Sequence, residues 1–311
     1  MKTKREPDVP AGFASWAEVM RVQEAMNASA EGLAVTAYRH KIKKHTETLA
    51  PKLRIVITPG TPRGQGSCRG SAFYDTPHVI ERYLDHRHSG VSSPNHVMEE
   101  PTFLEELGTV RDLRVLDLGC GDATLGRALL AAGCRSYLGI DGSAEMVRAA
   151  AVNLAGSSGR VEKMDIEEFA APSGTFDLIV SRLALHYVDD LTPVLSACWR
   201  SLSPGGRLLI TVVHPVITSH EAHQSTREAR TDWVVDDYFH TGARRRDWLG
   251  STVTWYHRTI EDYVTALTRA HFAITSLREC APRHDRFDGD VAELARRRRV
   301  PLFLLLAGSR V

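Results

Sequence analysis

The sequence has 311 residues, of which 43% are hydrophobic, so it is long enough to bury a full α/β core. Its 39 basic and 38 acidic residues nearly cancel, so the charge does not indicate a nucleic-acid partner. Five cysteines without the spacing of a metal site fit the reducing cytoplasm better than a disulfide framework. No apolar run reaches the roughly 18 residues of a membrane span, and the basic N-terminus lacks the apolar part of a signal peptide. We therefore expect a cytoplasmic protein with no membrane partner.

Residues 1–70 differ from the rest of the chain. Residues 15–18 resemble the capped start of a helix, and residues 59–66 have the glycine and proline content of a linker. We predict an N-terminal extension over residues 1–70 and a main domain over residues 71–311. The extension is either a lid or arm exchanged between subunits of a homo-oligomer, or a loosely attached segment with no part in the chemistry.

The most informative pattern lies between residues 114 and 126. A short apolar strand is followed by Gly119 and Gly121, which let the backbone turn sharply and approach a ligand closely. Helical spacing resumes at Thr124, so the segment has the form of the first half of a nucleotide-binding unit. Two features depart from a dinucleotide fingerprint: Thr124 stands where a third glycine is expected, and Asp117 lies two residues before the first glycine. A carboxylate there suits a positively charged ligand and would repel a pyrophosphate.

With Asp117 included, this segment resembles motif I of the class I S-adenosylmethionine (SAM) dependent methyltransferases. Later segments keep the order of the same family. Residues 141–146 resemble its motif II, Phe176-Asp177 resembles the opening of its fourth strand, and residues 202–206 resemble the turn into its fifth. The resemblance covers roughly residues 71–311 and implies SAM as the cofactor, with its methionine part held by the glycine loop.

Other positions also match the family's cofactor site. Asp141 lies twenty residues after Gly121 at the end of an expected strand, where an acidic side chain can bind both ribose hydroxyls. The alternative role for Asp141 is a helix N-cap. The resemblance implies that Met146 packs on adenine, that Asp165 accepts a hydrogen bond from the adenine amino group, and that the backbone N–H of Ile166 bonds the ring.

The alternating pattern predicts strands near residues 115–118, 136–140, 161–164 and 175–181, and a fifth strand entered through the turn at residues 202–208. Residues 299–306 read as a charged approach followed by a buried strand. The resemblance implies an α/β fold, with a doubly wound, Rossmann-like sheet of seven mostly parallel strands. It also implies an N-terminal helical cap and a lid after the fifth strand. We expect the cap over about residues 74–107 and the lid over residues 214–253. Tyr74 either packs on the cofactor, as in the family, or only packs within the cap.

Candidates for chemistry lie after the fourth and fifth strands. Ser181 ends the fourth strand, directly above the expected sulfonium. His186 is the first candidate for a base acting on a hydroxyl or phenol, because it follows that strand end and an imidazole titrates near neutral pH. His214 is the second candidate, and His257 and Tyr238 follow. For each of them the alternative is a structural group, and His186 has the further alternative of lining the site without acting as a base.

These patterns predict a methyltransferase whose acceptor is a small molecule, such as a metabolite or natural-product intermediate. The acceptor atom is expected to be oxygen or nitrogen, with carbon as a further candidate. No metal is expected, because the histidines in residues 220–223 are three apart, where a zinc helix needs four. A nucleic-acid or protein methyltransferase is one alternative, although residues 181–184 lack the amide-bearing tetrapeptide of nucleic-acid amino-methyltransferases. A non-catalytic SAM-binding module is the other.

Overall fold

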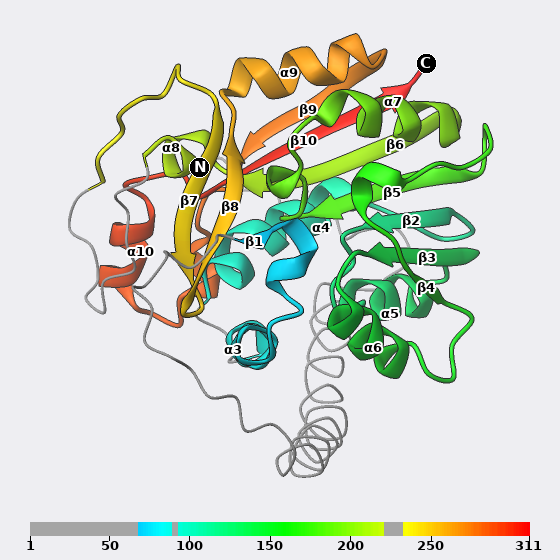
Figure 1. Cartoon of the computed structure of the whole chain (residues 1–311), viewed down its shortest axis with the longest axis horizontal. Coiled ribbons are helices and arrows are strands. Elements are labelled where there is room, and N and C mark those ends of the chain that lie inside the picture. Colours follow the sequence, from blue (N-terminus) through cyan, green and yellow to red (C-terminus); the bar gives the residue numbers. More distant parts are fainter. Residues whose placement is uncertain (1–67, 89–92, 221–232) are drawn as a thin grey trace, which may run out of the picture. The chain divides into compact units, whose positions relative to one another are not determined.

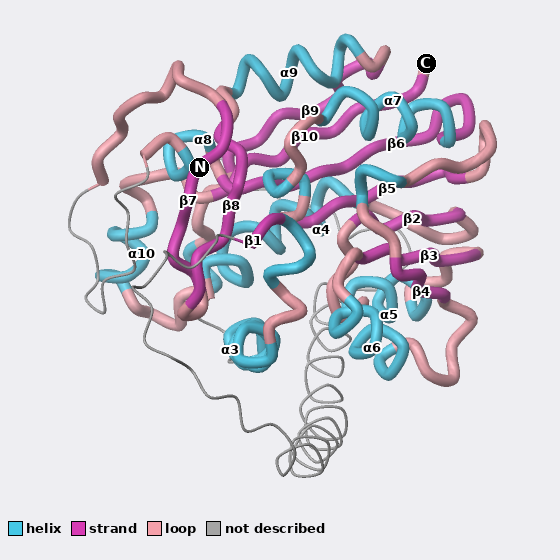
Figure 2. The backbone as a smooth tube through the Cα atoms, in the orientation of Figure 1, coloured by secondary structure: helices cyan, strands magenta, loops and turns pink. Residues whose placement is uncertain are grey.

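A seven-stranded sheet forms the centre of the protein (Figures 1 and 2). The computed structural model describes residues 68–88, 93–220 and 233–311. The strand order is β4-β3-β2-β5-β6-β10-β9. In chain order the strands are β2 (Arg114–Leu118), β3 (Ser136–Asp141), β4 (Arg160–Lys163), β5 (Phe176–Arg182), β6 (Leu202–Val213), β9 (Phe272–Glu279) and β10 (Phe303–Arg310). The predicted strands are therefore present, with ends that differ by a few residues.

Five strands, β4, β3, β2, β5 and β6, run parallel, and β10 runs antiparallel to both of its neighbours, β6 and β9. The chain leaves β2 toward β3 and β4 and then returns to β5 on the other side of β2. The strand order thus reverses beside β2, and ligands of open α/β sheets bind outside the carboxyl ends of the strands at such a point. The topology places the candidate site there.

Helices cover both faces of this sheet. On one face, α7 (Leu191–Ser201) and α9 (Ile260–Arg269) bury apolar side chains against Ile210 and Val212 of β6. Thr211 lies between those two residues and so points to the other face, where its hydroxyl donates to Glu99, just before α4 (Glu100–Leu107). Such a sheet, buried on both sides, has the predicted doubly wound α/β fold.

The remaining helices connect the strands and follow local signals. Helix α5 (Thr124–Ala131) follows β2, and α6 (Ala144–Asn153) follows β3. One 3-10 turn, η5 (Leu185–Tyr187), follows β5. Helix α7 begins at Leu191, where the Asp190 side chain caps it by accepting from Thr192 N. Other short helices are η4 (Ile166–Glu168), α8 (Pro215–Thr218), η6 (His284–Arg286) and α10 (Val291–Arg297).

The cap contains a 3-10 turn, η2 (Gly70–Phe73), the helix α3 (Pro77–His88), a π-helical segment, η3 (Asn95–Glu99), and α4. The predicted lid after the fifth parallel strand contains a β-hairpin, β7 (Gly242–Trp248) and β8 (Ser251–His257). A short strand, β1 (Cys68–Arg69), pairs in parallel with β8, so cap and lid share a second sheet of order β1-β8-β7 (Figure 1). The sequence did not indicate this connection.

The predicted N-terminal extension and its proposed role as an oligomer arm lie almost wholly outside the described residues. The boundary at residue 70 therefore stays a prediction. Within the described parts of the chain, no helix has the length and apolar character needed to cross a membrane.

Candidate active site

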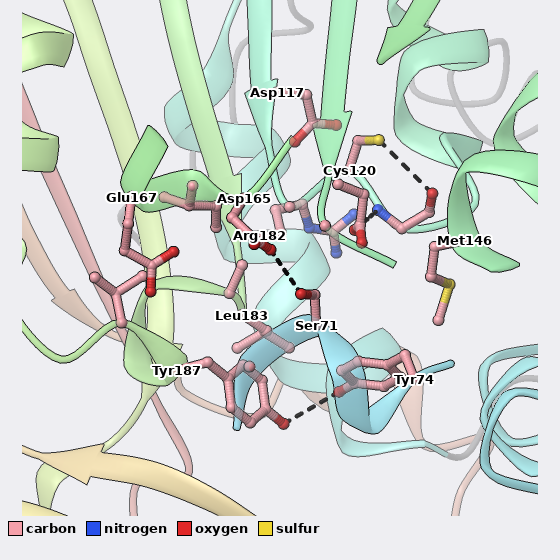
Figure 3. A pocket seen from close by; sticks show the side chains of 18 of the residues that line it. Ser71, Tyr74, Asp117, Cys120, Met146, Asp165, Glu167, Arg182, Leu183 and Tyr187 are labelled. Atoms are coloured by element: carbon pink, nitrogen blue, oxygen red, sulfur yellow. Dashed lines mark hydrogen bonds between the residues drawn. The ribbon is translucent and has the colours of Figure 1, made fainter. Parts of the chain in front are cut away.

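A pocket lies at the carboxyl ends of β2, β3 and β5, between the sheet and the cap (Figure 3). Eight of the nine residues predicted to bind the cofactor line it: Tyr74, Asp117, Gly119, Gly121, Asp141, Met146, Asp165 and Ile166. The ninth, Ser181, is fully buried and donates its hydroxyl to the Leu118 carbonyl, 2.8 Å away, so it joins β5 to β2 beneath the pocket.

The glycine loop takes its shape from positive φ angles and from close packing. Gly119 and Gly121 have φ of 71° and 57°, which most L-residues avoid. A Cβ on Gly119 would lie 2.4 Å from the Cβ of Ala184. The Gly119 N–H donates to the Ile140 carbonyl at 2.9 Å, which ties the loop to β3. Glycine at position 119 is therefore required by both backbone conformation and space.

Asp117 is a carboxylate held within a buried strand. Only 2% of its surface is exposed, and the Tyr137 hydroxyl donates to its Oδ2 at 2.8 Å. The ring of Tyr137 fits because residue 126 is glycine: a Cβ there would lie 2.2 Å from the ring. The hydrogen bond from Tyr137 thus stabilises the negative charge of Asp117 at the pocket, and this charge suits a cationic ligand group.

Asp141 faces the pocket from the end of β3. Its Oδ2 accepts from Gly121 N and its Oδ1 from Ser143 N, each at 2.9 Å. The N-cap of α6 is Ser143, whose hydroxyl accepts from Met146 N, so the alternative N-cap role for Asp141 is wrong. Burial raises the pKa of Asp141 to about 6, because the ionised form is poorly solvated. Each oxygen keeps lone-pair capacity for a further donor.

The cap is hydrogen-bonded to the same wall of the pocket. The Ser71 hydroxyl donates to Asp165 Oδ1 at 2.7 Å, and the Ser143 hydroxyl donates to Asp75 Oδ1 at 2.7 Å. Gly142 leaves room for the first of these bonds, since a Cβ there would lie 1.9 Å from Asp165 Oδ1. Ser71 and Asp75 gave no sequence signal, because their partners are about 70 to 90 residues away along the chain.

Aromatic side chains from the cap and from η5 form another wall. In Figure 3, Tyr74 and Tyr187 lie across the pocket from Asp117, and their hydroxyl oxygens are 3.1 Å apart. Tyr83 of α3 packs on Tyr74, with ring centroids separated by 5.0 Å. Burial raises the pKa of Tyr74 well above its usual value, so this phenol stays protonated. Tyr83 and Tyr187 were not predicted.

Arg182, at the end of β5, is a further lining residue that sequence reasoning missed. Its guanidinium makes a two-pronged ion pair with Glu99, and it also stacks on Phe103 at 4.8 Å from the ring centroid. Glu99 is fully buried and accepts from Thr211 as well. The ion pair thus ties the pocket to the π-helical segment of the cap.

None of the four residues predicted to be catalytic is among the residues that line the pocket. His186 comes closest, because it precedes the lining residue Tyr187 and stacks on its ring at a centroid distance of 4.4 Å. The Nδ1 of His186 is buried without a hydrogen bond to the described residues. Burial, with the charges of Arg246 and Arg258, lowers the pKa of His186 to about 3.

The other three predicted catalytic residues lie in the lid region, and their side chains make hydrogen bonds to other residues of the chain. His214 caps α8: its Nδ1 accepts from Val216 N at 3.2 Å, so its Nε2 carries the proton that is donated to Glu279. His257 bonds through Nδ1 to Thr218 and through Nε2 to the carbonyl of Tyr238. The Tyr238 hydroxyl accepts from Ile260 N at 3.4 Å, so each of the three side chains has contacts that fit its structural alternative.

The described residues contain no group of three or more histidine, cysteine or acidic side chains that could hold a metal ion. The residues that line the pocket suit another ligand. Asp117, Asp141 and Asp165 offer three acceptors in a row at neighbouring strand ends, and Met146 adds an apolar contact. Such a set fits SAM, which has an ammonium group, a ribose diol, an adenine amine and an apolar ring face.

Comparisons with known proteins agree with this fit. A family model described as a methyltransferase domain matches residues 116–210. A solved SAM-dependent methyltransferase from Mesorhizobium loti is 31% identical and superimposes with a TM-score of 0.64, over 71% of this chain and 100% of its own. This chain is a SAM-dependent methyltransferase. Its cofactor is therefore SAM.

Two curated proteins are also similar to this methyltransferase. An uncharacterized protein from Haemophilus influenzae is 30% identical over 216 residues, which are 66% of this chain and 85% of that protein. A ubiquinone biosynthesis O-methyltransferase from Xanthomonas oryzae pv. oryzae is 32% identical over 131 residues. The match spans 40% of this chain and about half (54%) of that relative.

Proposed function

We propose that this methyltransferase transfers the methyl group to a small-molecule acceptor. The acceptor atom is oxygen or nitrogen in this proposal, with carbon as a further candidate. The observation that carries this proposal is the aromatic wall of the pocket, Tyr74 and Tyr187, which packs against an apolar cluster from the cap and the hairpin. Phe73, Tyr74 and Val79 of the cap pack with Tyr187 and with Val253 of the hairpin. A wall built from both cap and lid favours an acceptor small enough to be enclosed, over a nucleic acid or a folded protein.

The lining residues receive specific roles in this proposal. Asp117 pairs with the ammonium of SAM, Asp141 binds the ribose hydroxyls, and Asp165 accepts from the adenine amine. Met146 packs on adenine, the Ile166 N–H bonds the ring, and Gly119 and Gly121 let the backbone approach the methionine part. Support comes from the position of all seven residues around one pocket and from the support that Tyr137 gives Asp117.

Bound SAM supplies a methyl group on a positively charged sulfur. The chain's main contribution is then to position the acceptor and to exclude water, because an in-line displacement gains most from alignment of the reacting atoms. Tyr74 and Tyr187 line the acceptor side in this proposal. His186, with a pKa of about 3, takes up a proton poorly at pH 7, so we propose that it orients the acceptor by a hydrogen bond.

Transfer of labelled methyl groups tests the acceptor class. Purified protein is incubated with methyl-labelled SAM and a bacterial extract that has been separated by ultrafiltration into a metabolite fraction and a macromolecular fraction. We expect label in the metabolite fraction, and much less of it when Asp141→Ala replaces the wild-type protein at a SAM concentration below saturation. Label in RNA or protein, with none in metabolites, would contradict the proposal and favour the macromolecular alternative.

A further inference from the structure

The β7–β8 hairpin packs against two residues that line the pocket, Tyr74 and Tyr187. Its tip is bonded to α3, since Arg82 donates to the Leu249 carbonyl at 3.2 Å and His78 lies 2.9 Å from the Ser251 hydroxyl. Trp248 and Leu249 pack in the same apolar cluster as the lining residues Tyr74 and Tyr187. A side chain on the inner face of β7 therefore lies close to the acceptor side of the pocket.

Arg246 is on that inner face. Exposure alternates along β7: Arg244, Arg246 and Trp248 are partly buried, whereas Arg245 and Asp247 are exposed. The guanidinium of Arg246 lies over the ring of Trp255, 4.5 Å from its centroid, and 5.5 Å from the centroid of Trp248. Two indole rings thus hold the planar guanidinium in a defined orientation, which lowers the entropy lost when it binds an anion.

A short series of contacts joins Arg246 to the pocket. Trp255, under the guanidinium, meets His186 edge-on at a centroid distance of 6.0 Å, and His186 stacks on Tyr187 at 4.4 Å. His186 is 98% buried, and its Nδ1 makes no hydrogen bond to any described residue. A buried nitrogen without a partner is costly, so a ligand group beside it would gain a hydrogen bond as well as the cation.

The charges differ between the two walls. Asp117, Asp141 and Asp165 give the cofactor wall negative charge, while Arg246 and Arg258 act on His186 from the other side. Burial lowers the pKa of His186, and the positive charges of Arg246 and Arg258 lower it further. Burial raises the pKa of Tyr187, and Arg246 opposes that rise. The guanidinium of Arg246 therefore lies close enough to His186 and Tyr187 to influence both side chains.

We infer that the methyl acceptor carries an oxyanion, a carboxylate or a phosphate, which Arg246 binds beside His186 and Tyr187. The inference deepens the proposed function and rests on it. An anionic end fixed on the hairpin orients the acceptor so that its other end points toward the cofactor wall. The aromatic side chains between these ends suit an acceptor with an apolar or aromatic body.

Binding of matched probes to the complex with S-adenosylhomocysteine (SAH) tests this subsite. Calorimetry compares 4-hydroxybenzoate with 4-hydroxybenzamide, which has nearly the same shape but no charge, and phenyl phosphate tests the other oxyanion. We expect the acid to bind at least about tenfold more tightly than the amide, as a charge-assisted hydrogen bond provides. Comparison of the benzoate and the phosphate shows which oxyanion is preferred.

The hairpin offers a matched control. Arg246→Met should remove the preference for the acid, Arg246→Lys should keep part of it, and Arg245→Met, on the exposed face of the same strand, should keep all of it. SAH affinity, measured first in each protein, should stay unchanged. Equal binding of acid and amide by the wild type, no binding of any probe, or the same loss in Arg245→Met would each overturn the subsite. With SAH affinity intact, these results would leave the proposed function standing.

Discussion

Asp141 combines a defined spacing from the glycine loop with two backbone hydrogen bonds and a raised pKa. The bonds from Gly121 N and Ser143 N fix both carboxylate oxygens toward the pocket. A side chain fixed in this way needs no reorganisation when a diol binds, which makes it the best single residue for testing the cofactor site.

Replacement of Asp141 by alanine should weaken SAH binding by about 1–3 kcal/mol, because two ribose hydroxyls lose their acceptor. Calorimetry measures the change. Asp285→Ala, an exposed carboxylate of η6, is the control and should leave the affinity unaltered. Equal affinity of the Asp141→Ala protein and the wild type would remove Asp141 from the site.

The pKa of about 6 at Asp141 predicts a pH dependence of cofactor binding. Hydroxyls donate to the ionised carboxylate, so binding favours the deprotonated form and must displace a proton below pH 6. The affinity for SAH should be constant above this value and fall by up to about tenfold for each pH unit below it. Asp141→Ala should bind weakly and with no such slope. A slope that persists in this variant would assign the titration to another group.

At the scale of secondary-structure elements, the cap is joined to the sheet by polar bonds at defined points. Asp75 accepts from the Ser143 hydroxyl at 2.7 Å and from Glu145 N at 3.2 Å, so it holds the start of α3 against the N-terminus of α6. Arg182 and Glu99 join the end of β5 to η3. The first contact lies beside the cofactor site, and the second joins the lining residue Arg182 to the buried Glu99 of the cap.

Asp75→Ala should loosen the cap without unfolding the sheet. We expect faster amide hydrogen exchange in residues 70–85 and a loss of SAH affinity of about 1 kcal/mol, since the cap contributes residues to the pocket. Mass spectrometry of exchanged peptides measures the first effect. Glu81→Gln, on the exposed part of α3, is the control. Exchange that does not change would show that this bond does not hold the cap.

Glu99→Gln should destabilise the fold. The side chain of Glu99 is fully buried and that of Arg182 is only 13% exposed, so the variant removes the two-pronged partner of a buried guanidinium and leaves it only the more distant carboxylate of Glu100, 3.5 Å away. We expect a loss of about 3 kcal/mol in the free energy of unfolding, measured with urea. For the surface pair of Glu145 and Arg148, Glu145→Gln should cost less than about 1 kcal/mol. Similar small losses in both variants would contradict the structural role of the buried pair.

At the scale of the whole molecule, local sequence patterns predicted the large sheet and the cofactor wall. Strands such as β2 and β5 are short apolar segments bounded by turn residues, whereas β9 was not predicted. Gly119, Asp141 and Asp165 stand at strand ends, where parallel topology brings them together. The small β1-β8-β7 sheet could not be predicted in this way. It pairs Cys68 with Val253, and a two-residue strand has no periodicity to detect.

The aromatic and basic side chains of the acceptor wall could not be predicted from local sequence patterns either. Tyr83, Tyr187 and Arg246 come from a cap helix, a 3-10 turn and a hairpin, and only the folded chain brings them close. Histidine chemistry alone suggested His214 and His257, whereas the structure gives their ring nitrogens hydrogen bonds within the protein. Eight of the residues predicted to bind the cofactor line the pocket, most of them at strand ends that local spacing marks, whereas no local spacing relates the side chains of the acceptor wall.

The most direct test of the whole account is isothermal calorimetry of the full chain with SAH, alongside a nicotinamide dinucleotide. The acidic wall and the glycine pair predict micromolar binding of SAH at one site per chain. They also predict no binding of the dinucleotide, because Asp117 would repel its pyrophosphate. Absence of SAH binding, or equal binding of both ligands, would contradict the assignment of this pocket to SAM.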